Sequence, residues 1–304
     1  MIKRTLLLGK PMYVRTEHEQ LVLELDDHAA SRPIEDLGFV VVEHPRVRFS
    51  TPALQKLAAA NVVVVFCGED YLPSSLLLPL DQHYVSGKHT RAQVSASRPL
   101  NKQLWQQTVK AKLRAQAQAL DLLTDGGEPL RRLARRVRSG DPDNLEAEAA
   151  RRYWSVVFHG HVDGFTRDRM GDSPNELLNY GYAILRSATA RAIVGAGLHP
   201  TFGIHHRNQY NAFCLADDLM EPYRPAVDLL VVGMLREGIA LAGEITPEHK
   251  RRLLEVTQVE TERDGKRGSL MVALQRSAWS LAGCFVGTHK RISYPDRVWT
   301  TPLT

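Results

Sequence analysis

The sequence is poor in cysteine, and its cysteines do not form a recognisable motif. The 304 residues include three, at Cys67, Cys214 and Cys284, and none belongs to a Cys-x-x-Cys pair. Each lies among apolar residues, so we expect three reduced, buried thiols rather than disulfides or a zinc site. Reduced thiols are typical of the cytoplasm, where we expect this protein to act.

Long hydrophobic runs are also missing. The longest strongly apolar run, Leu229 to Leu235, is far shorter than the roughly 20 residues that cross a bilayer. The first ten residues have only a short apolar core and do not resemble a secretion signal. The sequence therefore predicts no membrane association.

Two common catalytic motifs do not occur. There is no Gly-x-Gly-x-x-Gly loop for a dinucleotide and no His-Glu-x-x-His pair for a zinc protease. The formal net charge is +5, with charged residues at 24%. This charge permits a polyanionic partner without requiring one.

The N-terminal part favours strands. The runs at residues 38–43 and 61–68 are rich in β-branched residues and bounded by turn formers. A cap followed by Pro52 predicts a short helix between them. We expect a small β-rich domain over residues 1–86, followed by a polar linker over residues 87–98 that has no clear periodicity.

Helical patterns dominate from residue 99 onward. Apolar residues recur at helical spacing at Leu100, Leu104, Val109 and Leu113. Further helices are predicted over residues 128–138, 145–157, 175–194, 227–236, from Thr246, and 270–285. Strands grouped before helices predict an α+β fold, with the small β-rich domain followed by a large all-α domain over residues 99–304.

A cluster of imidazoles and carboxylates stands out in the helical part. His205 and His206 follow a Gly-Ile turn, and Asp218 and Glu221 come about a dozen residues later at a spacing that places them on one side of a helical turn. Carboxylates suit a hard divalent cation, and a single His shifts the preference toward Mn²⁺ over Ca²⁺. The best candidate for a further carboxylate ligand is Glu146.

Each of these residues also has an ordinary structural interpretation. Asp143 and Glu146 could form a capping box at the start of a helix. Asp217, Asp218 and Glu221 could be acids that stabilise a helix N-terminus. Spacing alone leaves both interpretations open.

Several basic clusters could follow a phosphate backbone. Arg131, Arg135 and Arg138 share one stripe of a predicted helix, which could bind successive DNA phosphates or simply face solvent. Arg224 lies beside the acids and could hold either Glu221 or a phosphate.

Four sequence blocks occur in a specific order between Asn144 and Asp228. They are Asn-Leu-Glu-Ala-Glu-Ala-Ala-Arg-Arg-Tyr-Trp, Asn-Glu-Leu-Leu-Asn-Tyr-Gly-Tyr-Ala-Ile-Leu, Gly-Leu-His-Pro-Thr-Phe-Gly-Ile-His-His and Asp-Leu-Met-Glu-Pro-Tyr-Arg-Pro-Ala-Val-Asp. Together they resemble the CRISPR spacer-acquisition integrase and endonuclease family, the catalytic subunit of the CRISPR adaptation complex, and the fourth block favours its type II branch. One departure is Ala147, where the family often has Gly.

The resemblance implies a site and a reaction. Glu146, His206 and Glu221 match the family's catalytic metal ligands for Mg²⁺ or Mn²⁺, with Asp218 and Arg224 as auxiliary residues. The implied reaction joins the 3′-OH ends of a protospacer into the repeat array by transesterification. A metal-dependent DNA endonuclease outside CRISPR and a non-catalytic DNA-binding scaffold remain the alternatives.

The resemblance also implies partners. These are double-stranded DNA, as protospacer and repeat, and a second copy of the chain, contacted through the N-terminal β-domain. A small ferredoxin-like adaptation subunit would bridge the homodimer. In the type II branch, the effector nuclease and a further accessory protein would join.

Overall fold

The computed structural model describes residues 4–69, 72–79, 83–239 and 245–299. Its N-terminal part contains β1 (Arg4–Leu8), β2 (Met12–Glu17), β3 (Gln20–Glu24), β4 (Ala29–Pro33), η1 (Ile34–Asp36), β5 (Leu37–Val42), β6 (Val47–Phe49), α1 (Thr51–Ala59), β7 (Val63–Cys67) and β8 (Pro73–Leu77). The rest contains α2 (Ser86–Val94), α3 (Arg98–Thr124), α4 (Glu128–Arg136), α5 (Leu145–Val157), α6 (Asn175–Gly195), α7 (Cys214–Met220), η2 (Glu221–Tyr223), α8 (Arg224–Arg236), α9 (Pro247–Leu254), η3 (Glu255–Gln258), β9 (Glu260–Arg263), β10 (Lys266–Ser269) and α10 (Leu270–Phe285).

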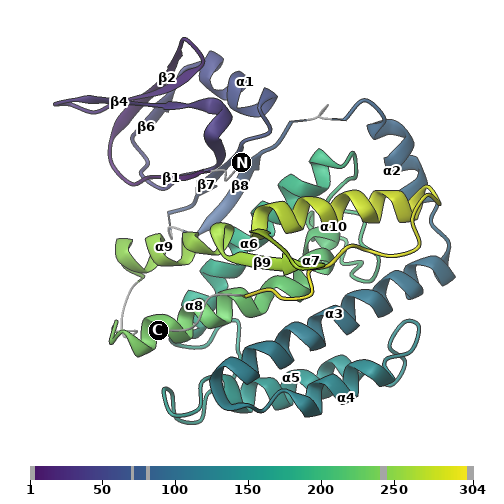
Figure 1. Cartoon of the computed structure of the whole chain (residues 1–304). Coiled ribbons are helices and arrows are strands. Elements are labelled where there is room, and N and C mark those ends of the chain that lie inside the picture. The colour runs from purple at the N-terminus through teal and green to yellow at the C-terminus, as the bar shows by residue number, and fades with distance from the viewer. Residues whose placement is uncertain (1–3, 70–71, 80–82, 240–244, 300–304) are drawn as a thin grey trace.

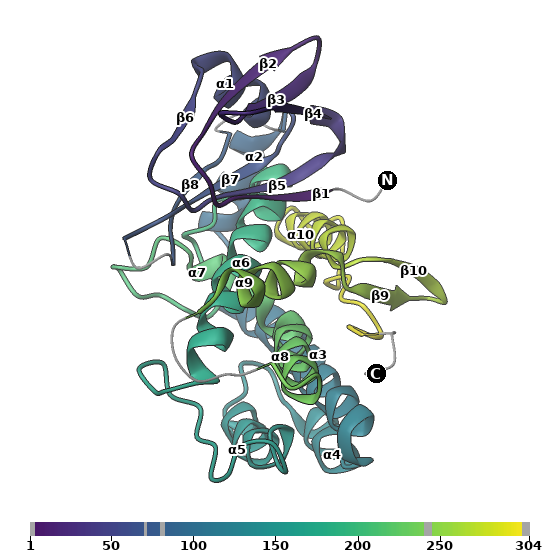
Figure 2. The same ribbon diagram turned by 90° about the vertical axis from the view of Figure 1, so that its left-hand side faces the viewer.

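The N-terminal strands form two four-stranded sheets with α1 packed among them, and the helices from α3 onward lie on one side of this part (Figures 1 and 2). One sheet has the order β1-β5-β7-β8, with the first three strands parallel and β8 antiparallel. The other has the order β4-β3-β2-β6. The α+β class predicted from the sequence is confirmed, with strands first and helices after them.

The central strands of the first sheet, β5 and β7, are covered on both faces, which couples the two parts of the chain. In β5, Val40 and Val42 belong to the core of the N-terminal part, whereas Phe39 and Val41 belong to the core of the helical part. The alternation follows from the two-residue period of a strand. A continuous β-branched run is typical of such a doubly covered parallel strand.

Most of the segment predicted as an irregular linker is helical, since Ser86–Val94 forms helix α2. The expectation of irregular structure there was wrong. The buried side chain of Gln93 donates to the carbonyl groups of His199 and Phe202 at 2.9 and 2.8 Å, and accepts from the N–H of His199 at 3.0 Å. These tertiary hydrogen bonds anchor a sequence whose own helical signal is weak.

The helical part is not all-α, which corrects a second expectation. Strands β9 and β10 pair as an antiparallel hairpin around Asp264 and Gly265, whose φ values of 49° and 71° lie in the left-handed region. An Asp-Gly pair at positive φ is typical of a tight hairpin turn. The strands are only four residues each, and their charged sequence conceals the alternation expected of a strand.

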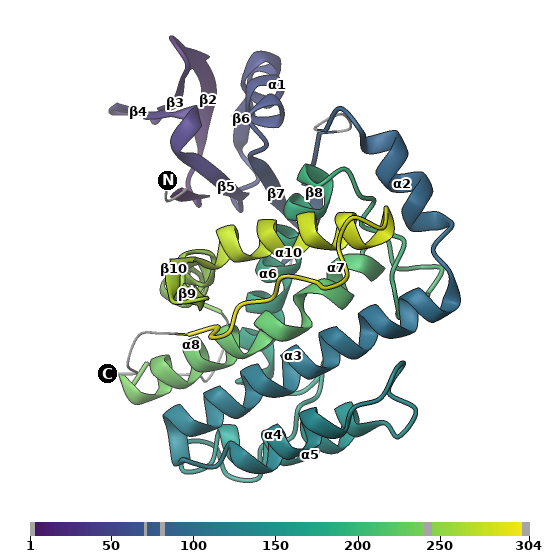
Figure 3. The same cartoon turned by 45° about the vertical axis from the view of Figure 1, so that its right-hand side comes forward.

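Helix α3 is the longest helix of the described residues and passes through the middle of the helical part. Its N-terminus is capped by Ser97, whose hydroxyl accepts from the N–H of Leu100 at 3.3 Å. Helices α4 and α5 lie along one side of it, and α7, η2 and α8 pack against it as well (Figure 3). Residues from α5 and η2 are thereby brought to the same stretch of α3.

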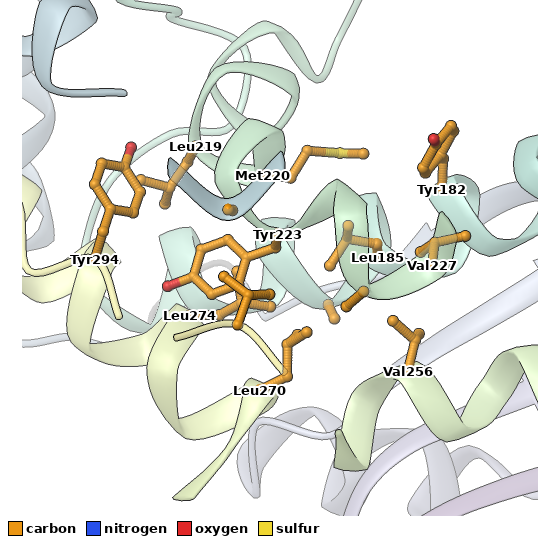
Figure 4. Close-up of a cluster of buried hydrophobic side chains, with 14 of the residues drawn as sticks. Tyr182, Leu185, Leu219, Met220, Tyr223, Val227, Val256, Leu270, Leu274 and Tyr294 are labelled. Atoms are coloured by element: carbon orange, nitrogen blue, oxygen red, sulfur yellow. The ribbon is translucent and has the colours of Figure 1, made fainter. Parts of the chain in front are cut away.

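The core beside α3 is built from α6, α8 and α10. Figure 4 shows Leu270 and Leu274 of α10 beside Tyr223, with Leu185 of α6 and Val227 of α8 farther along the same cluster. Tyr223 is fully buried, and its hydroxyl lies 2.8 Å from that of Ser277. This packing fixes η2, the short turn that carries Glu221. Across the residues that the structure describes, no helix is both long and apolar enough to cross a membrane.

Candidate active site

Lys112 of α3 joins two of the predicted metal ligands. Its Nζ donates to Oε1 of Glu146 at 2.6 Å and lies 2.6 Å from Oε2 of Glu221. Helix α5 supplies Glu146 and η2 supplies Glu221, so three elements meet at one ammonium group. The Glu221 side chain is 7% exposed and that of Lys112 13%, which makes this a largely buried ion triad.

Arg224 supplies a second cation to Glu221. Its Nη1 donates to Oε1 of Glu221 at 2.9 Å. Burial alone would raise the pKa of Glu221, but the charges of Arg224 and Lys112 outweigh it and lower that pKa to about 2. Glu221 is therefore ionised at any pH at which the protein would act. The prediction that Arg224 could hold Glu221 agrees with this geometry.

Asp218 fixes the orientation of His206. Oδ1 of Asp218 lies 2.6 Å from Nδ1 of His206, and the same carboxylate accepts the backbone N–H groups of His205 and His206 at 2.9 and 3.2 Å. A carboxylate can only accept, so Nδ1 carries the proton, and in the neutral imidazole Nε2 keeps its lone pair. A carboxylate behind an imidazole in this way is typical of metal-binding histidines.

The indole of Trp105 supports the same turn. Its ring is stacked on that of His205, with centroids 4.1 Å apart, and meets the ring of His206 edge-on at 5.9 Å. Trp105 is itself buried. His205 is thus a packing partner of Trp105.

A buried tyrosine pair holds the next carboxylate along α8. Tyr153 donates to Oδ2 of Asp228 at 2.7 Å, and Tyr182 donates to Oδ1. Burial raises the pKa of Asp228 to about 6, although both hydrogen bonds oppose the shift. The guanidinium of Arg224 lies 4.1 Å from the centroid of the Tyr182 ring. Asp228, Tyr182, Arg224 and Glu221 therefore form one connected chain of contacts.

A cleft of about 900 Å³ opens beside these residues. Strand β8 and the segment before it, the loop before α6, and helices α6, α7, α8 and α9 contribute to its walls. Of the residues that the structure describes, five cationic side chains line it: Arg167, Arg169, Arg186, Arg224 and Lys250. His206 and Glu221 line it too, together with the acids Glu69, Glu176 and Asp217, so part of the candidate site faces a cleft that carries charges of both signs.

The structure brings the predicted ligands only partly together. Glu146 and Glu221 contact the same ammonium, and His206 and Glu221 line the same cleft. In the part of the chain that the structure describes, no three His, Cys, Asp or Glu side chains form a group that could hold a metal ion. The metal site therefore stays a prediction.

The donor set nevertheless fits a hard divalent cation. Two ionisable carboxylates and one imidazole with a free Nε2 are suitable ligands for Mg²⁺ or Mn²⁺. Oε2 of Glu221 is buried and accepts no hydrogen bond from the described residues, although it lies close to the Lys112 ammonium. This buried carboxylate oxygen would be available as a ligand once the ammonium no longer occupied the space beside it.

The capping-box interpretation of Glu146 is wrong. The structure has Asn144 at the start of α5, and Asp141, not Asp143, accepts the N–H groups of Leu145 and Glu146, each at 3.0 Å. Asp143 instead pairs with Arg138 at 2.7 Å. Since Asp141 caps the helix, the side chain of Glu146 is free to face Lys112.

The predicted arginine stripe is only partly realised. Helix α4 ends at Arg136, so Arg138 lies beyond the stripe because the chain turns extended at Val137. Arg131 pairs with Asp121, Arg135 with Glu128, and Arg138 with Asp143. Their role in DNA binding stays a prediction. The arginines of the cleft are the ones that lie beside the candidate site.

The sequence did not identify Lys112 as a residue of the candidate site, although its position on a buried helical stripe was visible there. Trp105, Val109, Lys112 and Gln116 fall on one stripe of α3, and the other three of them are buried. A lysine at such a core position usually has a carboxylate partner. The partners themselves, from α5 and η2, could not be named from that stripe alone.

Comparison with known proteins supports the family. The family described as "CRISPR associated protein Cas1" matches residues 6–261. A relative from Neisseria meningitidis serogroup C (strain 8013), a CRISPR-associated endonuclease Cas1, is 33% identical over 97% of both chains. Another Cas1 endonuclease, from Francisella tularensis subsp. novicida (strain U112), is 26% identical over 96% of this chain and 99% of its own.

Solved structures agree in fold. A casposase bound to its integration product matches with a TM-score of 0.80 and 19% identity, over 95% of this chain and 92% of that chain. A CAS1 protein from Thermotoga maritima matches with a TM-score of 0.75 and 16% identity, over 95% of this chain and 98% of that one. With a profile match over most of its length and a 33% identical relative along nearly all of it, this chain belongs to the Cas1 family of CRISPR-associated proteins.

Proposed function

We propose that this chain is the metal-dependent DNA integrase of a CRISPR adaptation system, which joins protospacer 3′-OH ends into a repeat array. The observation that carries the proposal is the convergence of Glu146 and Glu221 on Lys112, together with a cleft that Glu221 shares with His206 and with several arginines. The curated relatives are named as endonucleases, and cleavage is the same displacement at phosphorus with water as the nucleophile.

The residues of this chain have separable tasks in that reaction. Glu146, His206 and Glu221 would hold Mg²⁺ or Mn²⁺, which when bound polarises a phosphoryl oxygen and activates the attacking hydroxyl. Asp218 keeps Nδ1 of His206 protonated and its Nε2 available. Arg167, Arg169 and Arg186 would hold the DNA backbone along the cleft.

The joining step needs no oxidant or reductant. The oxygen of the incoming 3′-OH forms a bond to phosphorus while the bond from phosphorus to the target's 3′ oxygen breaks, and the proton lost by the nucleophile is replaced on the leaving oxygen. One phosphodiester is exchanged for another, so the arginines need only hold the two strands in line.

The assembly is proposed with the same function. One similar fold occurs in a solved Cas6-RT-Cas1–Cas2 complex, at a TM-score of 0.71 and 20% identity over 98% of this chain and 36% of that chain. We propose that this chain acts in the cytoplasm as a homodimer bridged by a small ferredoxin-like subunit. The Neisseria relative favours the type II branch, in which an effector nuclease and an accessory protein would take part.

The decisive experiment is a joining assay on a supercoiled plasmid that carries a repeat, with and without the small partner subunit. We expect Mn²⁺-dependent joined products from the native chain, none in the presence of EDTA, and none from Glu146→Ala, His206→Ala or Glu221→Ala. Glu148→Ala is the matched control, since Glu148 lies on the same helix and pairs with Arg152 instead.

Two other results would point to the alternatives. Only cut fragments, with no joined product at a repeat, would indicate an endonuclease outside CRISPR. DNA binding that is indifferent to metal and to all three substitutions would indicate a non-catalytic scaffold.

A further inference from the structure

The Lys112 ammonium occupies the space between two carboxylates that would bind the catalytic metal. Its Nζ lies 2.6 Å from Oε1 of Glu146 and 2.6 Å from Oε2 of Glu221. A divalent cation shared by the same two oxygens would have to lie at comparable distances from both. Two cations cannot occupy that space together.

The local charge is already balanced without a metal. Glu146 and Glu221 contribute two negative charges, and Lys112 and Arg224 contribute two positive charges in direct contact with them. Adding a divalent cation to this largely buried group leaves an excess of positive charge, which is costly at low local dielectric. Departure of Lys112 removes half of that excess.

The two cations differ in how easily they can leave. Arg224 is held on a second side, because its guanidinium lies over the ring of Tyr182. Lys112 has a flexible four-carbon stem, and its ammonium is a compact charge that can be rehydrated. Apart from the two glutamates, no partner for the Lys112 ammonium is found among the described residues.

We propose that Lys112 is an internal competitor of the catalytic metal: it holds Glu146 and Glu221 together in the metal-free protein and must be displaced when the cation binds. The inference rests on the proposed function, since it takes these carboxylates as metal ligands. It assigns Lys112 a role in setting metal affinity, so that the site fills only above a threshold metal concentration.

The test is direct titration of the metal-free protein with MnCl₂, without DNA, by calorimetry and by thermal unfolding. Lys112→Gln and Lys112→Met are both neutral and differ in polarity. Lys110→Gln, two residues earlier on the same helix, is the matched control. We expect Mn²⁺ to bind both Lys112 variants about tenfold more tightly than the native chain, because one unit charge no longer competes, and to bind the Lys110 variant as it binds the native chain.

Thermal unfolding supplies a second readout that does not depend on activity. Without metal, both Lys112 variants should melt below the native chain, because two carboxylates then face each other beside a single arginine. Mn²⁺ should raise their melting temperature by more than it raises that of the native chain, since tighter binding gives greater stabilisation. A Lys112 that only positions the carboxylates predicts the opposite, namely weaker binding and a smaller rise.

A double variant, Glu146→Ala/Glu221→Ala, separates this inference from the proposed function. If it loses Mn²⁺ binding while the Lys112 variants bind no more tightly than the native chain, competition by Lys112 is overturned and the site stands. If it binds Mn²⁺ like the native chain, the carboxylates are not the ligands, and both the site and the inference fail.

Discussion

Asp218 holds His206 through a hydrogen bond of 2.6 Å between Oδ1 and Nδ1. The bond raises the pKa of His206, while its partial burial opposes the shift. Because Asp218 is fully buried and also accepts two backbone N–H groups of the same turn, one carboxylate sets both the path of the chain and the direction in which the imidazole points.

Asp218→Ala should therefore affect both stability and metal binding. Loss of the carboxylate removes the acceptor of two backbone N–H groups, and each lost hydrogen bond costs about 0.5–1.5 kcal/mol in the free energy of unfolding. It also frees the His206 ring, and loss of such a supporting residue lowers metal affinity by about 10- to 100-fold. Chemical denaturation and Mn²⁺ titration would measure the two effects.

The neighbouring residue is the control for that prediction. Asp217 pairs with Asn211 at 2.7 Å and does not support His206 through a hydrogen bond. Asp217→Asn should keep the native Mn²⁺ affinity. Equal losses of affinity in both variants would contradict the specific role given to Asp218.

Glu221→Gln should lose stability in a pH-dependent way. The pKa of Glu221 is lowered to about 2 from 4.5, since Arg224 and Lys112 outweigh the effect of burial. A lowered pKa means that the ionised group stabilises the fold above about pH 4.5, and that this contribution, about 3 kcal/mol, disappears as the pH falls toward 2.

The measurement is the difference in unfolding free energy between the native chain and Glu221→Gln at several pH values. We expect the native chain to be more stable at pH 7 and the difference to shrink below pH 4.5. A difference that is constant over this range would show that the Glu221 charge does not stabilise the fold.

Comparison with Asp228→Asn should reveal a pH dependence of the unfolding free energy that has the opposite sign. Burial raises the pKa of Asp228 from 3.8 to about 6, even though Tyr182 and Tyr153 donate hydrogen bonds to it. The folded protein therefore binds this proton more tightly than the unfolded chain. The stability contributed by the proton is complete below about pH 4 and is lost as the pH rises to 6, an amount of about 3 kcal/mol.

The comparison is again between the native chain and the variant. Relative to Asp228→Asn, the native chain should become less stable between pH 4 and 6 and change little above that. Asn keeps the size of the side chain without titrating. The Tyr153→Phe variant, which removes one donor, should raise the pKa of Asp228 further and extend the fall to higher pH.

Much of the fold follows from local patterns in the sequence. The helices over residues 145–157 and 270–285 have the predicted bounds, because apolar periodicity and clear end signals coincide there. Helix α2 was missed since its stability comes from Gln93 and the carbonyl groups it binds in a distant loop. Hairpin β9–β10 was missed because its strands are short and charged.

The candidate site shows the same division. The motif blocks identified Glu146, His206 and Glu221, and the i, i+3 spacing placed Asp218 near Glu221. Neither could reveal that Lys112 lies between the two glutamates, because that contact joins three elements that are distant in sequence. Pair contacts across elements depend on helix packing angles, which periodicity does not determine.

The ion pair between Lys250 and Glu43 connects the helical part of the chain to the N-terminal part, and its removal tests how much it stabilises that contact. Lys250 lies on α9 and Glu43 follows β5, and their side chains are only 6% and 9% exposed. Removing one partner leaves the other charge buried, which costs about 3–5 kcal/mol. Lys250→Met should therefore lower the free energy of unfolding by about that amount.

Combining Lys250→Met with Glu43→Leu should recover most of the loss, because replacing both charges with apolar groups of similar size is often neutral or stabilising. Chemical denaturation of the native chain, both single variants and the double variant gives the coupling free energy between the two residues. Arg251→Met is the control on the same helix, since Arg251 is 70% exposed and pairs only at 3.8 Å with Glu248. If the double variant is as unstable as the two single losses added together, the two charges act independently, and their pairing does not hold the β-sheet against the helices.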